Sequence, residues 1–189
     1  QEGSRNTRSI ENEISRIKTH SIKYCYMLAL KTTDLCDLHT GKIKIVEPIG
    51  FKDFGGRKNF SGKIYTVKCF EDNSFVRKAL ETNGEGKVLV VDGGGSMRCA
   101  LLGDMLGDLA IKNKWNGIII YGCLRDSAAI GNLSLGVKAL NTIPLKSNKK
   151  NVGEENITVH FAGVDFVPGE FVYCDEDGII VSKVELNTI

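Results

Sequence analysis

Histidine and closely spaced cysteine are scarce in this 189-residue sequence, which argues against the common imidazole and thiolate metal sites. The three histidines are isolated from one another, and none of the six cysteines forms a Cys-x-x-Cys pair. A zinc site would need such ligands at close spacing. Cysteines 69, 99, 123 and 174 lie in or beside apolar runs, so we expect them to be reduced and buried as small apolar side chains. Reduced cysteines are typical of a cytoplasmic protein.

A strong net charge and a long apolar run are also missing. The chain has 25 basic and 23 acidic residues, a formal net charge of +2, and its basic residues are not clustered as on a dedicated nucleic-acid surface. No apolar run approaches the roughly 18 residues of a membrane span, and no signal-peptide pattern is recognisable. We therefore expect a cytoplasmic protein that contacts neither a membrane nor nucleic acid directly.

The remaining composition is typical of a globular domain, with 42% apolar and 25% charged residues. The length suits one domain with a sizeable core. We interpret residues 1–30 as an N-terminal extension, because Ile10, Ile14 and Ile17 follow helical spacing within a helix expected over about 9–30. That helix would pack on the domain or on a partner chain. Residues 31–189 are predicted to form the single domain.

Strand and helix signals follow one another from residue 32 onward. Unbroken apolar runs predict buried strands at 87–91 and 117–121, and the helix between them implies a right-handed parallel unit. Alternating or apolar segments predict further strands at about 43–49, 62–70, 134–137, 157–161, 170–174 and 178–183, with short helices at 33–38 and 73–82. The predicted fold class is α/β, with a mixed sheet and few helices.

A glycine-aspartate junction between the two buried strands is the first half of a candidate site. If the helix begins near Gly103, the N–H groups of Gly103, Asp104, Met105 and Leu106 have no intrahelical partner. The helix dipole would then help them to hold a substrate carboxylate. The alternative is one continuous helix over about 98–114, which would use these N–H groups internally.

The second half of the candidate site is Arg125-Asp126, which follows the second buried strand; twenty residues separate it from Asp104. Ligands of open α/β sheets bind at the carboxyl ends of the strands. Arg125 can hold a carboxylate or an enolate oxygen with two parallel bonds, and Asp126 is a hard oxygen ligand suited to Mg²⁺. A plain surface ion pair between the two is the alternative that the pattern leaves open.

The segment Asp92-Gly93-Gly94-Gly95-Ser96 also follows a strand, but it is not a GxGxxG motif. No acidic residue closes the next strand, as a ribose would require, and no Walker lysine is present. We interpret this segment as a tight crossing of backbones rather than as a nucleotide or S-adenosylmethionine site.

Taken together, these motifs resemble the regulator of ribonuclease activity A superfamily, which includes the 4-hydroxy-4-methyl-2-oxoglutarate aldolases. The resemblance covers about residues 32–184. The matching segments include Thr33-Asp34-Leu35-Cys36-Asp37, Phe54-Gly55-Gly56-Arg57, Asp92-Gly-Gly-Gly95, Gly103-Asp104-x-Leu106, Arg125-Asp126 and Asp177-Gly178-Ile-Ile-Val181. The enzymes of the family carry the aspartate and Arg-Asp in this register, whereas its non-catalytic regulators typically lack Arg-Asp. The resemblance implies a swivelling β/β/α domain, generally trimeric, with sites at subunit boundaries.

By this resemblance, the chain is a metal-dependent aldolase or decarboxylase that releases pyruvate from a 4-hydroxy-2-oxo diacid or from oxaloacetate. Gly103, Asp104, Met105 and Leu106 would contact the substrate, Arg125 and Asp104 would be catalytic, and Asp126 would hold Mg²⁺ or Mn²⁺. Family members also use an acidic residue of a neighbouring subunit, for which this sequence shows no match. The alternative function is a non-catalytic protein that binds and regulates a ribonuclease or an RNA-processing complex.

Overall fold

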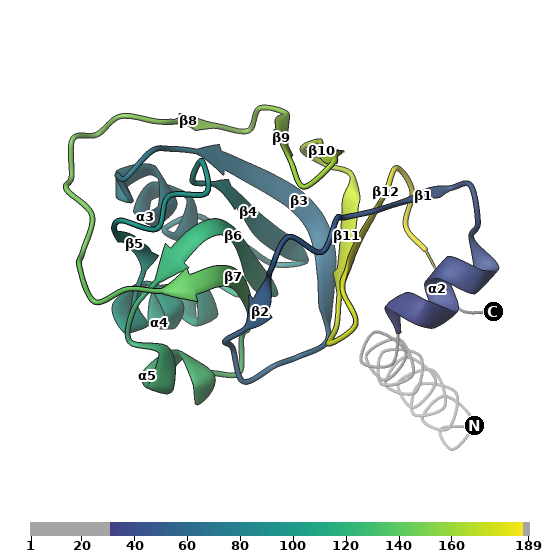
Figure 1. Cartoon of the computed structure of the whole chain (residues 1–189), viewed down its shortest axis with the longest axis horizontal. Helices are drawn as coiled ribbons and strands as arrows, with labels where there is room; N and C mark the ends of the chain where they lie inside the picture. The colour runs from purple at the N-terminus through teal and green to yellow at the C-terminus, as the bar shows by residue number, and fades with distance from the viewer. Residues whose placement is uncertain (1–30, 187–189) are drawn as a thin grey trace, which may run out of the picture.

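The computed structural model describes residues 31–186, which fold into four helices and twelve strands (Figure 1). The helix expected over about 9–30 lies outside these residues. The helices are α2 (Thr32–Leu38), α3 (Ser74–Leu80), α4 (Asp104–Lys112) and α5 (Ser127–Gly131). The strands are β1 (Ile43–Ile45), β2 (Lys52–Asp53), β3 (Phe60–Lys68), β4 (Lys87–Asp92), β5 (Ala100–Leu102), β6 (Gly117–Leu124), β7 (Gly136–Thr142), β8 (Glu154–Glu155), β9 (Val159–Phe161), β10 (Val164–Phe166), β11 (Phe171–Cys174) and β12 (Ile179–Ser182).

A ten-stranded mixed sheet organises the molecule, in the order β1-β12-β11-β3-β4-β6-β7-β2, with β5 paired to β6 and β8 to β3. The central strands β3, β4, β6 and β7 are parallel, and β5 also runs parallel to β6. Strands β9 and β10 form a separate hairpin. The mixed α/β sheet with few helices confirms the predicted fold class. Because parallel strands end at one edge, the segments that follow β4, β5 and β6 emerge close together.

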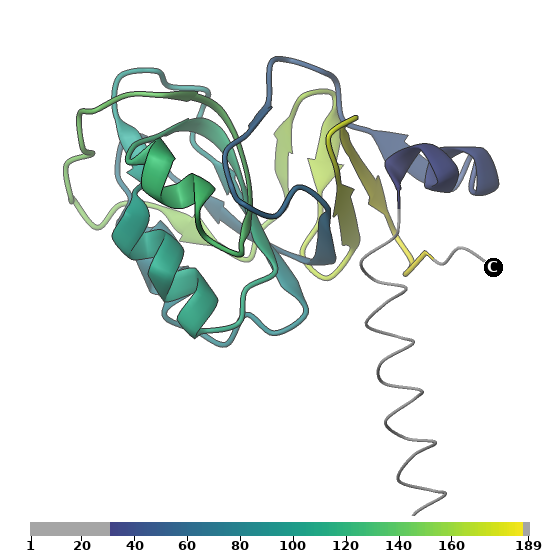
Figure 2. The ribbon, with the colours of Figure 1, turned by 90° about the horizontal axis from the view of Figure 1, so that it is seen from below.

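Each central strand serves two cores because its side chains alternate between the faces of the sheet. In β4, Leu89 and Val91 belong to the core under the helices, whereas Val88 and Val90 belong to the core on the opposite face. Helices α3, α4 and α5 supply the first core with apolar side chains. The β9–β10 hairpin and strands β11 and β12 supply the second. Figure 2 shows α4 and α5 side by side on the helical face.

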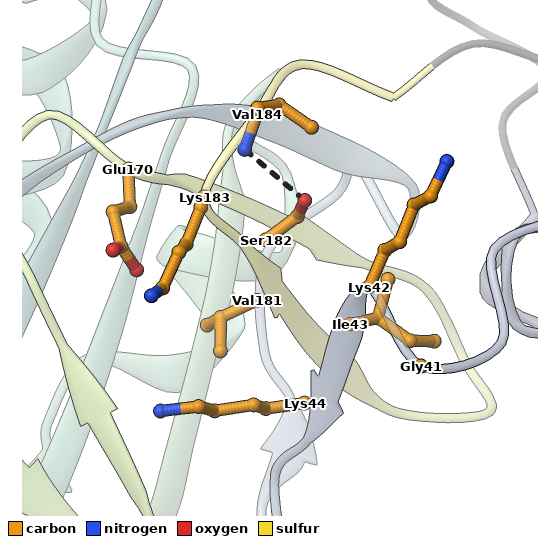
Figure 3. Close-up of a pocket in the computed structure, with 9 residues that line it drawn as sticks. All are labelled: Gly41, Lys42, Ile43, Lys44, Glu170, Val181, Ser182, Lys183 and Val184. Atoms are coloured by element: carbon orange, nitrogen blue, oxygen red, sulfur yellow. Dashed lines mark hydrogen bonds between the residues drawn. The ribbon is translucent and has the colours of Figure 1, made fainter.

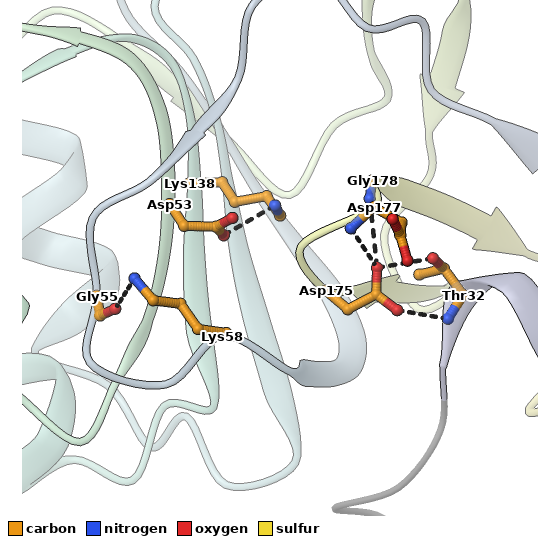
Figure 4. A network of polar contacts seen from close by, with 8 residues as sticks. All are labelled: Thr32, Asp53, Gly55, Lys58, Lys138, Asp175, Asp177 and Gly178. Carbon is orange, nitrogen blue, oxygen red and sulfur yellow. Dashed lines mark hydrogen bonds and ion pairs between the residues drawn. The ribbon is translucent and has the colours of Figure 1, made fainter.

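Helix α2 lies at the far end of the sheet, beyond β1 and β12 (Figure 1). Its N-cap, Lys31, makes no side-chain cap. A remote carboxylate takes that place: Asp175, in the β11–β12 turn, accepts hydrogen bonds from Thr32 N at 2.6 Å and from Thr32 Oγ1 at 2.7 Å. The same carboxylate accepts the N–H groups of Asp177 and Gly178 within its own turn (Figure 4). Asp175 therefore fixes α2 to the sheet.

A buried ion pair joins the last two strands of the opposite end of the sheet (Figure 4). Lys138 Nζ of β7 lies 2.8 Å from Asp53 Oδ1 of β2, and the lysine side chain is only 3% exposed. Removing one partner would leave the other charge buried without compensation, which is strongly destabilising. The pair therefore holds β2, and the Phe54-Gly55-Gly56-Arg57 turn that follows it, against β7.

Several element boundaries differ from the sequence-based expectation. Residues 100–102 form strand β5 and α4 begins at Asp104, so a continuous helix over 98–114 is wrong. Strand β6 continues three residues beyond 121 to Leu124, and β7 runs from Gly136 to Thr142 rather than over 134–137. The four cysteines expected to be buried are buried and free. Among residues 31–186, no helix is long and apolar enough to cross a membrane.

Candidate active site

Strands β5 and β6 bring the two halves of the candidate site together. Leu102 and Leu124, the last residues of these strands, are register partners in a parallel pair. Beyond them, the N–H of Arg125 donates to the carbonyl of Leu102 at 2.9 Å. Gly103 and Arg125 therefore leave the sheet side by side, although they are far apart in the sequence.

The side chains of Arg125 and Asp126 fold over Gly103. A Cβ added at Gly103 would lie 2.8 Å from Asp126 Oδ2 and 3.3 Å from Arg125 Nε. The glycine thus leaves room for a carboxylate and a guanidinium directly above the backbone at the start of α4. The arrangement agrees with the expected convergence of the two sequence motifs.

Asp126 has a left-handed backbone conformation, with φ of +56° and ψ of +37°, at the N-cap of α5. Such a conformation is unfavourable for a residue with a Cβ and persists where the surroundings enforce it, often at functional sites. Here α5 enforces it: the N–H of Ile130 donates to the Asp126 carbonyl at 3.0 Å, and the Ile130 side chain is fully buried. The sharp turn directs the Asp126 carboxylate back toward Gly103.

The polar contacts of this carboxylate are long. Arg125 Nε lies 3.4 Å from Asp126 Oδ2, and the N–H of Asp104 donates to the same oxygen at 3.5 Å. Both distances are at the outer limit of a hydrogen bond. The side chains of Arg125 and Asp126 are 39% and 38% exposed, so their direct attraction is weak. Both groups can therefore exchange these contacts for contacts with a ligand at small cost.

The N–H groups at the start of α4 are less available than the sequence suggested. Asp104 Oδ1 accepts the N–H of Met105 at 2.7 Å, and the Gly103 carbonyl accepts that of Leu106 at 3.1 Å. The expectation that all of these donors lack a partner is therefore wrong for Met105 and Leu106, because the first turn closes on itself and Asp104 caps it. The N–H of Asp104 keeps only its long contact with Asp126, which makes it the weakly engaged donor of this turn.

The carboxylates at this junction are of the kind that a hydrated divalent cation binds. Among residues 31–186, no group of three or more His, Cys, Asp or Glu side chains could enclose a metal ion. Mg²⁺ does not need such a cage, because it keeps several of its waters and binds through one or two carboxylates. Asp126 supplies one exposed carboxylate, and Asp104 follows Gly103 at the same junction. Asp126 is thus the residue that would hold the ion, with water completing its coordination.

The sequence did not predict the elements that hold the site residues in place. Helix α5, which holds the Asp126 turn, has only five residues and was not predicted. Helix α4 packs closely against the loop after α5: a Cβ added at Gly107 would lie 2.5 Å from Leu133 Cδ1. A glycine in the middle of a predicted helix is the one signal that could have indicated this close packing.

The glycine-rich segment after β4 is used for packing. The N–H of Gly94 donates to Asp92 Oδ1 at 3.0 Å, and that of Gly95 donates to the Tyr121 carbonyl at 3.1 Å. A Cβ added at Gly93 would lie 2.7 Å from the same carbonyl. These contacts confirm a tight crossing of backbones at this segment.

Residues 32–181 match a family model described as RraA-like, Aldolase/RraA. The chain belongs to the RraA-like family. A protein of Aromatoleum aromaticum named "Putative 4-hydroxy-4-methyl-2-oxoglutarate aldolase" is 58% identical over 159 residues, which are 84% of this chain and 99% of that protein. A protein of Alkalilimnicola ehrlichii with the same name is 56% identical, over 84% of this chain and 98% of its own length.

Solved structures of RraA-like proteins share the fold. A structure described as the RNA-processing inhibitor RraA from Thermus thermophilis superposes with a TM-score of 0.80 at 40% identity, over 85% of this chain and 96% of that one. A Geobacillus kaustophilus structure described as an S-adenosylmethionine: 2-dimethylmenaquinone methyltransferase superposes with a TM-score of 0.81 at 48% identity, over 83% of this chain and 97% of that one. Similar chains thus carry three different functional names, and the site geometry has to decide among them.

Proposed function

We propose that this RraA-like protein is a divalent-metal-dependent aldolase and decarboxylase that forms pyruvate from a 4-hydroxy-2-oxo diacid or from oxaloacetate. The observation that carries the proposal is the fold of Arg125 and Asp126 over Gly103, where a guanidinium, a carboxylate and a weakly bonded N–H face one point. The names of the bacterial relatives support an aldolase of this kind.

The substrate would bind with its 2-oxo acid end at this point. Arg125 would orient the 2-oxo acid with two parallel bonds, and the N–H of Asp104 would add a donor at the helix N-terminus. In the aldol cleavage, the 4-hydroxyl loses its proton, the C3–C4 bond breaks, and its electron pair forms the pyruvate enolate, which is then protonated at C3. Asp104 would hold the water that receives and returns the proton.

Charge develops on the enolate oxygen in this step, so donors fixed there lower the barrier. Arg125 is such a donor. Mg²⁺ or Mn²⁺ held by Asp126 would supply Lewis-acid stabilisation of the same oxygen when bound. In oxaloacetate, the bond between C3 and the C4 carboxylate breaks. This step releases CO₂ and leaves the same enolate, so one site would serve both substrates.

We propose in addition that the protein acts as a homotrimer. The trimer follows from the family resemblance, and the exposed side chains of Arg125 and Asp126 are accessible to a neighbouring subunit. Light scattering of the purified chain tests this: a trimer mass is expected, and a monomer that retains full turnover would contradict it.

Regulation of a ribonuclease or of an RNA-processing complex remains the second candidate, favoured by the similarity to the Thermus thermophilis RNA-processing inhibitor. A methyltransferase function has less support in this chain, because the N–H groups of Gly94 and Gly95 are bonded within the fold. Such a cofactor site would rely on free groups of this kind.

A chelator experiment separates the two candidates. Purified protein is mixed with oxaloacetate or 4-hydroxy-4-methyl-2-oxoglutarate, and pyruvate release is followed with a coupled dehydrogenase. We expect turnover with Mg²⁺ that stops with EDTA and returns when Mg²⁺ is restored. Absence of turnover with either substrate, together with inhibition of RNA cleavage by a purified ribonuclease, would establish the regulator instead.

A further inference from the structure

A hollow of about 590 Å³ lies at the β1 end of the sheet, and it shares no residue with the candidate active site (Figure 3). Three lysines line it, Lys42, Lys44 and Lys183, and Glu170 is the only carboxylate among its lining residues. Figure 3 shows Lys44 and Lys183 extending to the same side, with Glu170 beside Lys183. The lining therefore carries a net positive charge.

Strand pairing explains why apolar and basic groups meet there. Lys44 is the register partner of Val181 in the antiparallel β1–β12 pair, so the two share a face of the sheet. Lys183 follows the end of β12, and its side chain extends to the same side as that of Lys44 (Figure 3). Val181 is almost fully buried and forms part of the floor. The hollow thus has an apolar floor beneath ammonium groups.

Strand β1 also presents a free edge. It ends the strand order, and within residues 31–186 no strand pairs with its outer side. The N–H of Val46 donates to Ile179 of β12, so the alternation of an antiparallel ladder turns the peptide groups of Ile43 and Ile45 outward. The side chain of Ile45 is 64% exposed. An open backbone edge, an exposed apolar side chain and lysines thus meet at one place.

We propose that this edge binds an extended segment of a partner protein in which acidic and apolar residues alternate. The segment would pair with the outward peptide groups of Ile43 and Ile45, as in other cases of strand addition. Its acidic side chains would lie on the face of Lys44, and its apolar side chains would lie beside Ile45, because cross-strand neighbours interact in this way.

The lysines also disfavour binding of a second copy of the chain at this edge. Lysine on an edge strand discourages pairing between like edges, because two copies of β1 would bring ammonium groups together. The same charges attract a carboxylate-bearing strand. The partner is therefore an acidic segment from a different protein.

A fluorescein-labelled Glu-Val-Glu-Val-Glu-Val-Glu peptide is a suitable probe, and its Lys-Val counterpart is the matched control. Fluorescence anisotropy with the full chain is expected to show binding of the acidic peptide only, weakening as salt is raised. Equal binding of both peptides, or binding of neither, would overturn the proposal.

Two sets of variants locate the binding. One variant reverses the charge at the hollow with Lys42→Glu, Lys44→Glu and Lys183→Glu. It is expected to lower the affinity for the acidic peptide at least about tenfold, because opposite cross-strand charges become like charges. The control variant reverses three exposed lysines elsewhere, at positions 112, 146 and 149, and should bind within about twofold of the parent if the hollow is the site. Equal weakening in both variants would contradict a specific site.

Ile45→Pro tests the backbone pairing without a change in charge. Proline is tolerated on an edge strand where its N–H faces outward, so the fold should survive while peptide binding falls. Heteronuclear NMR provides the matching readout, with amide shifts expected at residues 43 and 45. Shifts confined to other strands, unaltered peptide binding by Ile45→Pro, or a larger assembly mass on lysine reversal without peptide binding would each overturn the proposal.

Discussion

Asp72 and Asp126 both follow a parallel strand at the same edge of the sheet, yet their surroundings are opposite. Asp72 is 1% exposed and accepts the N–H of Ser74 at 2.8 Å, of Lys150 at 2.8 Å and of Val152 at 3.0 Å. Burial alone would raise its pKa, but these bonds and that of the Ser74 hydroxyl outweigh it and hold the pKa at about 2. Asp126 is exposed and has only two long contacts.

The difference separates a structural carboxylate from one that is available to a ligand. Asp72 ties the segment around residues 150–152 to the start of α3, and every bond it accepts comes from this chain. Asp126 is held in place by its backbone conformation rather than by bonds to its oxygens. Position at the carboxyl end of a strand therefore does not identify a ligand; the degree to which its oxygens are already bonded does.

The largest expected effect is that of Asp126→Asn on activity. The substitution keeps the shape of the side chain but removes the charge that would hold the cation, so turnover should fall about 10³-fold. Steady-state pyruvate release measures this. Thermal unfolding should change by no more than about 2 °C, because the carboxylate contributes little to stability. A large loss of stability would place Asp126 with Asp72 as a structural residue.

Arg125→Ala should lower turnover about 10²-fold, because one fixed donor to the developing oxyanion is lost. Arg125→Lys is the matched variant: it keeps the charge but not the planar fork, so it should recover only part of the loss. Activity equal to the parent in both variants would leave the guanidinium as a plain surface group.

Asp72→Asn should lower stability rather than turnover. Its folded pKa of about 2 lies below the ordinary aspartate value of 3.8, so the charged form contributes roughly 2 kcal/mol to folding. Since the folded pKa is the lower one, this contribution is present above about pH 4 and is lost as the pH falls toward 2. Urea unfolding at several pH values measures it. The parent should lose stability over that acidic range, and the variant should lose less; equal slopes would contradict the comparison.

Gly103→Ala should have the smallest effect, about a tenfold loss of turnover. Its Cβ would lie 2.8 Å from Asp126 Oδ2 and 3.3 Å from Arg125 Nε. Both atoms belong to side chains that can move aside, so the fold should be kept while the site is displaced. Gly93→Ala is a useful contrast, because its Cβ would meet the backbone carbonyl of Tyr121 at 2.7 Å. That variant should lose stability instead, and the reverse outcome would contradict the assignment of the two glycine segments.

Sequence alone predicted the elements with unbroken or alternating apolar patterns, such as β3, β4 and most of β6. It could not choose between the two interpretations of residues 98–106, because Leu101 fits a helix stripe as well as a short strand. Pairing with β6 decides in favour of β5, and pairing is a tertiary effect. Helix α5 escaped prediction because five residues carry too little periodicity.

The candidate site was predictable as a pair of motifs but not as a geometry. The spacing of Asp104 and Arg125 placed both at one edge of the sheet. Three features depend on the folded backbone: the left-handed turn at Asp126, the capping of Met105 by Asp104, and the four donors around Asp72. None of them leaves a pattern in composition or spacing, so the relative availability of the carboxylates became visible only in three dimensions.

Binding of Mn²⁺ followed by NMR tests the central claim most directly. The paramagnetic ion broadens the amide signals of nearby residues, and it can replace Mg²⁺ at an oxygen site. We expect substoichiometric Mn²⁺ to broaden the amides of residues 103–106 and 125–127 first, and Asp126→Asn to abolish this while the remaining spectrum is unchanged. Broadening that is centred elsewhere, or that persists in Asp126→Asn, would contradict a cation site at the Gly103 junction.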